Sequence, residues 1–310
     1  MGRARSEGET YGVGVLGLGY IGRAIAEDLS ESPRFRIVAA FDPANPADTP
    51  YPMLRSAREV VEHSDVDLVY VASPPRRHAE GVELAVEAHK AILCEKPLAP
   101  TVAEADRLAT LVLGAGLPNA INFAFPTVST GRALAEAVDR ALLGPVRSGS
   151  LVLRFRRWPQ AWHASAGPWL SSPDEGGFTR EVATHFLALA DRLLGPGTVR
   201  VANVERGPDG LESRVEAALD FGGVPFTVDA GFDETMDRPD DMTALFTLEC
   251  ADGTMAIENW TTPVDIPVDL PDGGGLAPTL AALLDGQPND LPDLAASARV
   301  VRLIEAILAS

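Results

Sequence analysis

The chain has 310 residues, long enough for two domains with separate cores, and its 46% hydrophobic and 23% charged residues are typical of a soluble globular protein. With 26 Lys and Arg against 44 Asp and Glu, its formal net charge of −18 opposes binding to nucleic acid or an anionic membrane. No stretch is apolar for long enough to span a bilayer, and Cys94 and Cys250 lack metal-ligand spacing. We therefore expect a cytoplasmic protein with two buried, reduced thiols, no metal, and no nucleic-acid or membrane partner.

The first predicted strand ends in a glycine-rich turn. Residues 13–16 (VGVL) favour a strand, and the apolar residues after the turn recur at helical spacing. The glycines of Gly17-x-Gly19-x-x-Gly22 therefore fall where a strand turns into a helix. They would permit a tight turn, close approach of a pyrophosphate to the backbone, and close packing of the helix on the strand. The pattern predicts a nucleotide-phosphate site.

A second determinant follows at the next strand. Residues 36–41 (RIVAAF) predict that strand, and Asp42 ends it 20 positions after Gly22. An acidic residue there can accept hydrogen bonds from the adenosine ribose and would repel a 2′-phosphate. The next basic residue is Arg55, far along the chain, so the sequence favours NAD over NADP. The alternative is an unrelated turn followed by an exposed loop aspartate.

Strands and helices continue to alternate up to residue 122. Apolar runs predict strands over 67–72, 91–94 and 118–122. Capping boxes at Ser56-x-x-Glu59 and Thr101-x-x-Glu104 open helices between them. This alternation predicts a doubly wound parallel sheet, in which ligands bind beyond the carboxyl ends of the strands. Lys96, just past one strand end, would project into the nicotinamide crevice, although a single lysine in such a turn is more often a solvated side chain.

The pattern changes beyond residue 124. After a helix over about 132–143, strands are predicted over 146–158, 199–206, 214–221, 225–232, 244–250 and 254–260. The short turns at 221–224 and 251–254 indicate an antiparallel sheet. A connection rich in Pro, Gly and Asp over about 261–275 leads to two final helices. The second half is thus predicted to be an α/β domain with an open sheet.

Glu181 and His185 lie four positions apart in a predicted helix over 181–195. This spacing places both side chains on one helix face, next to an apolar face that would be buried. A neutral imidazole there can take a hydroxyl proton, and a carboxylate can orient it. From the residues alone, a hydrogen-bonded structural histidine is the more common alternative.

Arginines and aromatic residues gather between the first strand of the second sheet and the helix of His185. The candidates for contact with a substrate are Arg154, Arg156, Trp162, His163, Trp169 and Arg180. An arginine could bind a carboxylate or phosphate group while an indole stacks on a ring. The alternative is that these side chains face solvent or a subunit interface.

Three segments resemble the Gfo/Idh/MocA oxidoreductases, the family of glucose-fructose oxidoreductase, inositol dehydrogenase and the rhizopine catabolism protein. These segments are 17–22 (GLGYIG), 72–75 (ASPP) with His78 beyond it, and 95–97 (EKP). The resemblance is best defined over residues 11–126. It continues through Trp169-Leu170, the Gly176-Gly177 pair and the helix of His185.

The resemblance implies a Rossmann dinucleotide-binding domain over 11–123. The polar residues 1–10 before it are expected to form a disordered tail. It also implies a substrate-binding and oligomerisation domain over 124–310, with an open, mostly antiparallel sheet and with final helices that pack back on the first domain. We therefore expect a homodimer or homotetramer.

The resemblance also implies the site residues. Those expected to bind NAD, or alternatively NADP, are Gly17, Gly19, Tyr20, Ile21, Gly22, Asp42, Ser73, Pro74, His78, Glu95, Lys96 and Asn122. Lys96, His185 and Glu181 are the expected catalytic residues, because the family carries Asp-x-x-x-His after a Gly-Gly pair. Glu181 replaces that Asp, and Ala188 and Ala124 stand where the family often has Asp and Arg. These departures make a polyol substrate unsafe to assign.

We predict an NAD(P)-dependent dehydrogenase or reductase that transfers hydride between nicotinamide and a small hydroxy or keto substrate. The substrate would be a sugar, cyclitol or related compound, neutral or anionic. In the expected mechanism His185 removes the hydroxyl proton and Lys96 stabilises the developing alkoxide. Two alternatives are a net non-redox, glycosidase-like enzyme that uses nicotinamide transiently and a dinucleotide-sensing regulator of the same fold.

Overall fold

The computed structural model describes residues 9–44, 48–160, 167–236, 241–271 and 274–310. The chain divides into two compact units, the first comprising Met1–Phe123 and Gly275–Ala298 and the second Ala124–Gly274 and Arg299–Ser310. Most of the predicted tail (residues 1–8), together with Trp162 and His163, lies outside the described residues.

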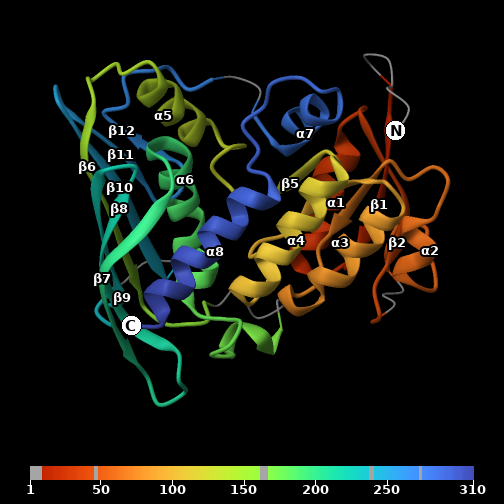
Figure 1. The fold of residues 1–310 in the computed structure, drawn as a ribbon, viewed down its shortest axis with the longest axis horizontal. Coiled ribbons are helices and arrows are strands. Elements are labelled where there is room, and N and C mark those ends of the chain that lie inside the picture. Colours follow the sequence, from red (N-terminus) through yellow and green to blue (C-terminus); the bar gives the residue numbers. More distant parts are fainter. Residues whose placement is uncertain (1–8, 45–47, 161–166, 237–240, 272–273) are drawn as a thin grey trace. The chain divides into compact units, whose positions relative to one another are not determined.

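The first unit is built on a five-stranded parallel sheet in the order β2-β1-β3-β4-β5 (Figure 1). Its strands are β1 (Tyr11–Leu16), β2 (Phe35–Phe41), β3 (Leu68–Val71), β4 (Ala91–Cys94) and β5 (Asn119–Ile121). β1, β3 and β4 are buried at every position, as expected for strands covered on both faces. Because all five strands are parallel, their carboxyl ends meet at one edge of the sheet.

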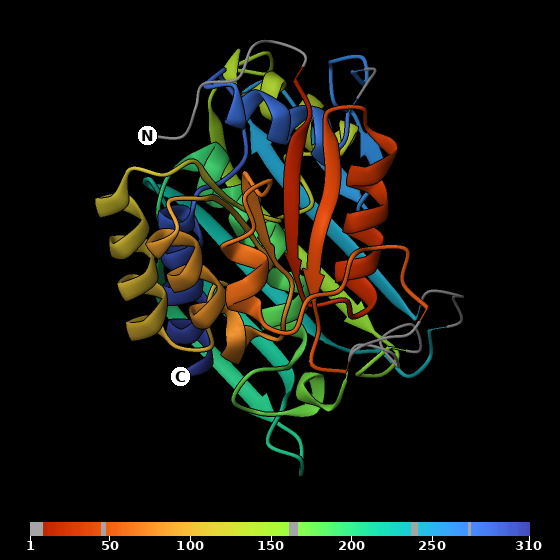
Figure 2. The same ribbon diagram turned by 90° about the vertical axis from the view of Figure 1, so that its right-hand side faces the viewer.

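Helices cover both faces of this sheet, as Figure 2 shows. They are α1 (Tyr20–Glu31), α2 (Ala57–Val61), α3 (His78–Glu87), α4 (Val102–Ala115) and α7 (Leu276–Leu284), with the short helix η1 (Pro75–Arg77) before α3. Both predicted capping boxes form, since the side chains of Ser56 and Thr101 accept hydrogen bonds from the backbone N–H groups of Glu59 and Glu104.

Helix α7 joins this unit although it lies far along the chain from the sheet. Its apolar residues, among them Leu276 and Leu280, enter the core formed by β1, β2 and α1. Asp285, at the end of α7, accepts a hydrogen bond from the Tyr11 hydroxyl at 2.6 Å and pairs with Arg34 at 2.9 and 3.0 Å. The side chain of Asp285 thus attaches α7 to the start of the sheet.

The second unit contains a seven-stranded sheet in the order β12-β11-β10-β6-β9-β8-β7. Its strands are β6 (Val146–Phe155), β7 (Gly197–Arg206), β8 (Glu212–Phe221), β9 (Val224–Phe232), β10 (Met242–Cys250), β11 (Thr254–Glu258) and β12 (Thr262–Val264). β6 and β9 pair in parallel, and the other neighbouring strands are antiparallel. The predicted fold class, a doubly wound parallel sheet followed by a mostly antiparallel one, is confirmed.

The helices of the second unit differ in detail from the prediction. α5 (Ser129–Asp139) begins and ends earlier than expected, and Ala141 beyond it takes a left-handed φ of 50°. The helix predicted over 181–195 begins as a π-helix, η4 (Thr179–Ala183), and continues as α6 (Thr184–Leu194). β12 forms within the predicted connection, because a three-residue strand is too short to give a sequence pattern. α8 (Leu294–Leu308) ends the chain.

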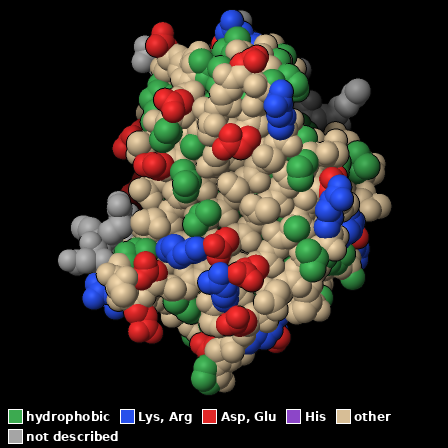
Figure 3. All heavy atoms as spheres, turned by 90° about the vertical axis from the view of Figure 1, so that its left-hand side faces the viewer, with side chains coloured by type: hydrophobic (Ala, Val, Ile, Leu, Met, Phe, Trp, Pro, Cys, Tyr) green, Lys and Arg blue, Asp and Glu red, His purple; other side chains and the backbone are tan. Residues whose placement is uncertain are grey.

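α5 and α6 pack on one face of this sheet, and its other face carries a row of small, uncharged side chains. Neighbouring strands align Thr247, Ser150, Thr227, Ala218 and Val201 across β10, β6, β9, β8 and β7. These alternate positions are partly or fully exposed. A broad area without charged side chains also crosses the middle of the view in Figure 3.

None of the described helices is both long and apolar enough to cross a bilayer.

The Asp285 contacts generate a stability prediction. Hydrogen bonding from Tyr11 and the neighbouring Arg34 guanidinium hold the pKa of Asp285 below its ordinary value of 3.8. Asp285→Ala should lower the free energy of unfolding by about 2 kcal/mol at about pH 7, because it leaves both donors without their acceptor. Since the folded-state pKa is lowered, the stabilisation is present above pH 3.8 and is lost as the pH falls through the folded-state value. Urea unfolding of both proteins at about pH 7 and about pH 3 measures this; an equal difference at both pH values would contradict the assignment.

Candidate functional site

The turn between β1 and α1 leaves room for a ligand at one glycine. Gly17 has a φ of +107°, and a Cβ there would lie 2.7 Å from the backbone of Ala72. A Cβ on Gly22 would lie 2.3 Å from the Gly17 carbonyl oxygen. A Cβ on Gly19 would meet nothing within 4 Å. The protein's own backbone therefore requires the first and last glycines, and the space at Gly19 is open.

The start of α1 suits an anion. Gly19 is its N-cap and supplies no side-chain hydrogen bond, and its first turn carries no acidic residue. The first backbone N–H groups and the positive end of the helix dipole therefore have no side-chain anion. Tyr20 and Ile21 are 52% and 42% exposed beside the turn. These features fit the pyrophosphate of a dinucleotide.

Asp42 lies directly beside this turn. One carboxylate oxygen accepts from the Leu18 N–H at 2.7 Å and the other from the Ala44 N–H at 2.8 Å. A carboxylate oxygen has further acceptor capacity, so ribose hydroxyls can still bind there. Arg23 donates to the Leu18 carbonyl at 3.0 Å and to Asp48 at 3.3 Å. Arg23 was not predicted at this site because it precedes Asp42 in the chain, whereas the first turn of α1 brings it back to the glycine turn.

Glu95 points into the protein at the end of β4. It is 9% exposed, and its Oε1 accepts from the Tyr70 hydroxyl at 2.7 Å and from Asn122 Nδ2 at 2.6 Å. Burial raises the pKa of Glu95, and burial together with the Glu95 charge raises that of Tyr70. Glu95 and Asn122, both expected at the cofactor, thus bond to each other and tie the ends of β3, β4 and β5 together.

Lys96 is half-buried, whereas every other residue from 91 to 99 is buried. The buried His78 holds the turn that carries Lys96 in place. His78 Nε2 lies 2.7 Å from the Ser73 carbonyl oxygen, and Nδ1 lies 3.0 Å from that of Pro97. Burial lowers the pKa of His78. The ring therefore joins the loop after β3 to the Lys96 turn, and it is only 1% exposed toward any ligand.

Two other predicted cofactor residues follow β3 at the same edge of the sheet. Pro74 is exposed, and Ser73 is half-buried. The Ser73 hydroxyl oxygen is buried and has no hydrogen-bond partner among the described residues. The carboxyl edge of the first sheet therefore brings together the glycine turn, Asp42, Ser73 and Lys96.

In the second unit, buried charges hold the start of the helix that carries Glu181 and His185. Glu212 on β8 accepts from the Thr179 N–H at 2.8 Å, and a Cβ on Gly177 would lie 2.3 Å from its carboxylate. Arg180 makes hydrogen bonds to Glu305 at 2.7 and 3.0 Å and to two backbone carbonyls. Arg180, predicted to contact substrate, is thus engaged inside the protein. Glu212, which no sequence pattern indicated, holds the start of the helix.

Glu181 and His185 differ in their surroundings. The π-helix at Thr179–Ala183 fits one more residue into its turn than an α-helix does. Glu181 is 8% exposed. His185 is half-buried, and it is the only residue from 175 to 191 that is not buried. Of the two side chains only that of His185 is thus partly exposed, and their position on one helix face stays a prediction.

An aromatic group surrounds His185. Its ring lies 5.3 Å from that of Trp260 at an interplanar angle of 74°, and Trp260 stacks on Phe125 at 5.8 Å. His185 Nδ1 accepts a hydrogen bond from the Ala124 N–H at 3.2 Å. Trp260 was not predicted as a site residue, because it ends a predicted strand and reaches His185 only through the turn between β11 and β12.

The remaining candidate arginines are paired with carboxylates. Arg154 bonds to Asp229 at 2.5 Å, and Arg156 lies 3.8 Å from Asp241. Trp169 is half-buried in the short helix η3 (Pro168–Ser171). Both cysteines are buried and free, as expected, and the described residues contain no cluster of His, Cys, Asp and Glu that could hold a metal ion.

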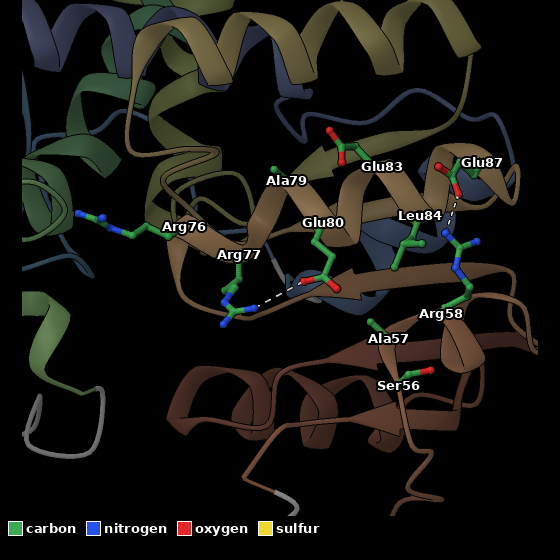
Figure 4. A pocket seen from close by; sticks show the side chains of 10 residues that line it. All are labelled: Ser56, Ala57, Arg58, Arg76, Arg77, Ala79, Glu80, Glu83, Leu84 and Glu87. Carbon is green, nitrogen blue, oxygen red and sulfur yellow. Dashed lines mark hydrogen bonds and ion pairs between the residues drawn. The ribbon is translucent and has the colours of Figure 1, made fainter.

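A groove of about 670 Å³ lies elsewhere on the first unit, between α2 and α3 (Figure 4). Its charged lining includes Arg58, paired with Glu87 at 3.1 Å, and Arg77, 3.8 Å from Glu80. The groove contains none of the predicted site residues, and these charges are neutralised within its own lining.

Comparison with known proteins gives a family match over the first unit. Residues 11–123 match the GFO_IDH_MocA model, described as "Oxidoreductase family, NAD-binding Rossmann fold". Over 137 residues the chain is 35% identical to dTDP-3,4-didehydro-2,6-dideoxy-alpha-D-glucose 3-reductase of Streptomyces violaceoruber, a match that covers 44% of this chain and 38% of that protein. The chain thus matches well under half the length of that curated relative.

Two solved structures share the whole fold. The WlbA dehydrogenase from Bordetella pertussis, in complex with NADH and UDP-GlcNAcA, has a TM-score of 0.82 at 17% identity and covers 97% of this chain and 95% of its own. KijD10, a 3-ketoreductase from Actinomadura kijaniata in complex with NADP and TDP-benzene, has a TM-score of 0.74 at 22% identity and covers 96% and 97%. Residues 11–123 of the chain thus match the model of the family that its motifs resemble, and the solved structures share its fold.

Proposed function

We propose that this protein is an NAD(P)-dependent dehydrogenase or reductase that interconverts a hydroxyl and a keto group on a sugar-like substrate. The observation that carries the proposal is the open space at Gly19, beside Asp42 and at the edge of the sheet where Lys96 emerges. A phosphate cradle, a ribose acceptor and a reactive amine at one edge are what nicotinamide chemistry requires.

The proposed cofactor contacts follow from this arrangement. The turn at Gly17–Gly22 and the start of α1 would hold the pyrophosphate, and Asp42 the adenosine ribose. Nicotinamide, when bound, supplies the hydride acceptor or donor. Lys96 and His185 are the groups we propose to handle the hydroxyl proton and the charge on its oxygen. Glu181, buried one turn before His185, completes the proposed catalytic set.

Two observations support a sugar as the substrate class. The relatives named above are described as acting on, or are crystallised with, nucleotide-linked sugars or a TDP derivative. The partly exposed indole of Trp260 lies beside the polar ring of His185, a combination that suits the C–H face and hydroxyls of a sugar ring. Because Arg154, Arg156 and Arg180 are paired with carboxylates, they give little support to an anionic sugar.

Absorbance at the reduced-nicotinamide band tests the activity directly. NAD and NADP would be offered separately with free sugars, cyclitols, sugar acids and nucleotide-linked sugars. A substrate-dependent signal supports the proposal and identifies the class. Binding of NADH without turnover across the panel would argue for a regulator or a net non-redox enzyme.

We further propose that the protein is a homodimer or homotetramer assembled through the outer face of the second sheet, along its uncharged row from Thr247 to Val201. The row from Thr247 to Val201 offers flat, uncharged contact area on strands that no described helix covers on that side. Such faces are suited to a symmetric contact between identical chains.

Lys96→Met should lower kcat by roughly 10²- to 10⁴-fold and leave the Kd for NADH nearly unchanged, because it removes a proton-handling group but no phosphate or ribose contact. Turnover would be followed by absorbance and NADH binding by fluorescence. Lys90→Met, at an amine that donates to the Val66 carbonyl, is the matched control and should keep its turnover. Normal turnover in the Lys96 variant would overturn its catalytic role.

Asp42→Asn should shift binding toward NADPH relative to NADH by roughly tenfold, a change of about 1.4 kcal/mol, because the repulsion of a 2′-phosphate is removed. Asp42→Glu keeps the charge and should retain the preference for NADH. Arg23→Ala in the Asp42→Asn background should cancel the gain, because Arg23 is the guanidinium beside this turn. Fluorescence titration with both reduced cofactors measures all three, and unaltered preference in Asp42→Asn would remove Asp42 as the selector.

Ser150→Arg combined with Thr227→Arg should convert the assembly to a monomer of about the chain mass, 32.8 kDa, because like charges would face each other across a symmetric contact. Leu113→Arg, at a residue on α4 that is 75% exposed, is the control for an added surface charge. Light scattering after size-exclusion chromatography gives the mass. A monomeric wild type, or a double variant that stays oligomeric, would exclude this face as the interface.

A further inference from the structure

The ring of His185 is bonded in a way that fixes where its proton lies. Nδ1 accepts a hydrogen bond from the Ala124 backbone N–H at 3.2 Å. A backbone N–H is always a donor, so Nδ1 must present its lone pair. In the neutral ring the other nitrogen, Nε2, then carries the proton.

The same bond opposes the charged form of the ring. An imidazolium carries a proton on both nitrogens, so Nδ1–H would point at the Ala124 N–H. The Glu181 carboxylate cannot relieve this through Nδ1, because that nitrogen has one lone pair and the Ala124 amide occupies it. His185 is therefore poorly suited to remove a proton, since Nε2 is already protonated and Nδ1 is engaged.

Trp260 holds the ring in this orientation. A half-turn of the imidazole would exchange Nδ1 with a carbon and break the bond to Ala124. The indole packs against His185 at 74°, and Phe125 and Phe186 pack against the indole at 5.8 and 4.9 Å. Phe125 directly follows Ala124 in the chain, so one short segment provides both the amide and the support for the indole.

The backbone that presents Trp260 is strained and bonded on both sides. Asn259 and Trp260 have φ values of +44° and +72°, a conformation uncommon for residues other than glycine. The Asn259 side chain accepts from the Ala244 N–H at 3.1 Å, and the Thr130 hydroxyl donates to the Trp260 carbonyl at 3.1 Å. Two successive left-handed residues persist only when surrounding contacts enforce them.

We propose that the Ala124 amide and Trp260 lock His185 as a neutral Nε2–H donor, which donates a hydrogen bond to the substrate oxygen instead of removing its proton. Trp260 is a positioning residue that acts through His185. The inference rests on the proposed dehydrogenase function, and it assigns removal of the proton to Lys96 instead of His185. On oxidation, bound nicotinamide would accept the C–H hydride, and the O–H proton would pass to the Lys96 amine, which accepts it in its unprotonated form, becomes an ammonium and releases the proton to water. His185 stabilises the developing negative charge on oxygen without a change in its own protonation.

Nitrogen-15 NMR of the histidine rings tests the tautomer without a substrate or cofactor. In the wild-type protein at about neutral pH, two-bond proton–nitrogen correlations should show His185 with a protonated Nε2 and a bare Nδ1. The His185 signals are identified by their loss in His185→Gln. A protonated Nδ1, in either a neutral or a charged ring, would overturn the proposal.

Trp260→Ala tests the positioning role against a matched change elsewhere. It should replace the single His185 pattern with the averaged signals of two tautomers, because the ring is free to turn. Trp158→Ala removes an indole that packs on Phe155 and Phe178, and it should leave the His185 pattern intact. Trp260→Phe should restore much of the wild-type pattern by refilling the space. A single Nε2–H pattern in Trp260→Ala would remove Trp260 from the proposal.

Kinetics separate a donor from a base. The side-chain amide of His185→Gln can place an N–H near the position of Nε2 but cannot take a proton at neutral pH. With a donor role, His185→Gln should keep kcat within roughly tenfold of wild type, whereas His185→Leu should lose roughly 10²- to 10³-fold. Equal losses in the two variants would identify His185 as a base and overturn the proposal. If no substrate is turned over, the proposed function fails while the NMR result still decides the tautomer.

Discussion

The carboxyl edge of the first sheet depends on one buried carboxylate. Glu95 is enclosed at the end of β4, where an ionised group without partners would cost several kcal/mol. The Tyr70 hydroxyl and the Asn122 amide offset part of that cost, and each comes from a neighbouring strand end. The ends of β3, β4 and β5 are thereby held at fixed spacing. Lys96, the next residue, therefore leaves the sheet from an anchored position.

The second unit positions its functional helix by the same means. Arg180, next to Glu181, is buried and bonded to Glu305, and Glu212 accepts the first N–H of the π-helix. In both units a buried charged residue directly precedes a proposed catalytic one in the chain. This arrangement costs desolvation energy, and removal of one partner would leave an unpaired buried charge. The bonds made by the buried residue restrict the backbone at the next residue, whose side chain must point in a defined direction.

Local sequence patterns predicted the parts of the fold that depend on local physics. Strand bounds in the first unit followed from runs of buried β-formers, and both capping boxes formed because the cap and its donor lie three residues apart. Gly17 and Gly22 could be assigned because the strand, turn and helix follow one another directly in the chain. The open space at Gly19 agrees with the same pattern.

Contacts between residues that are distant in the chain could not be predicted from sequence patterns. Arg180 meets Glu305, and Arg154 meets Asp229, over separations that no spacing rule covers. The π-helix at Thr179–Ala183 was also not predicted, and its first N–H donates to Glu212, a residue far along the chain. The apolar pattern around it is compatible with an ordinary α-helix, so the sequence predicted a continuous α-helix over 181–195.

The chemistry of His185 shows this limit most clearly. Its residue type indicates an acid or a base, and its spacing from Glu181 suggested a carboxylate partner. The partner found at Nδ1 is a backbone amide, a group that every residue except proline carries and that no side-chain motif can reveal. A carboxylate at Nδ1 would favour a proton on that nitrogen, whereas an amide excludes one. The same histidine is thus directed toward opposite roles by a contact that depends only on where the chain places the backbone of Ala124.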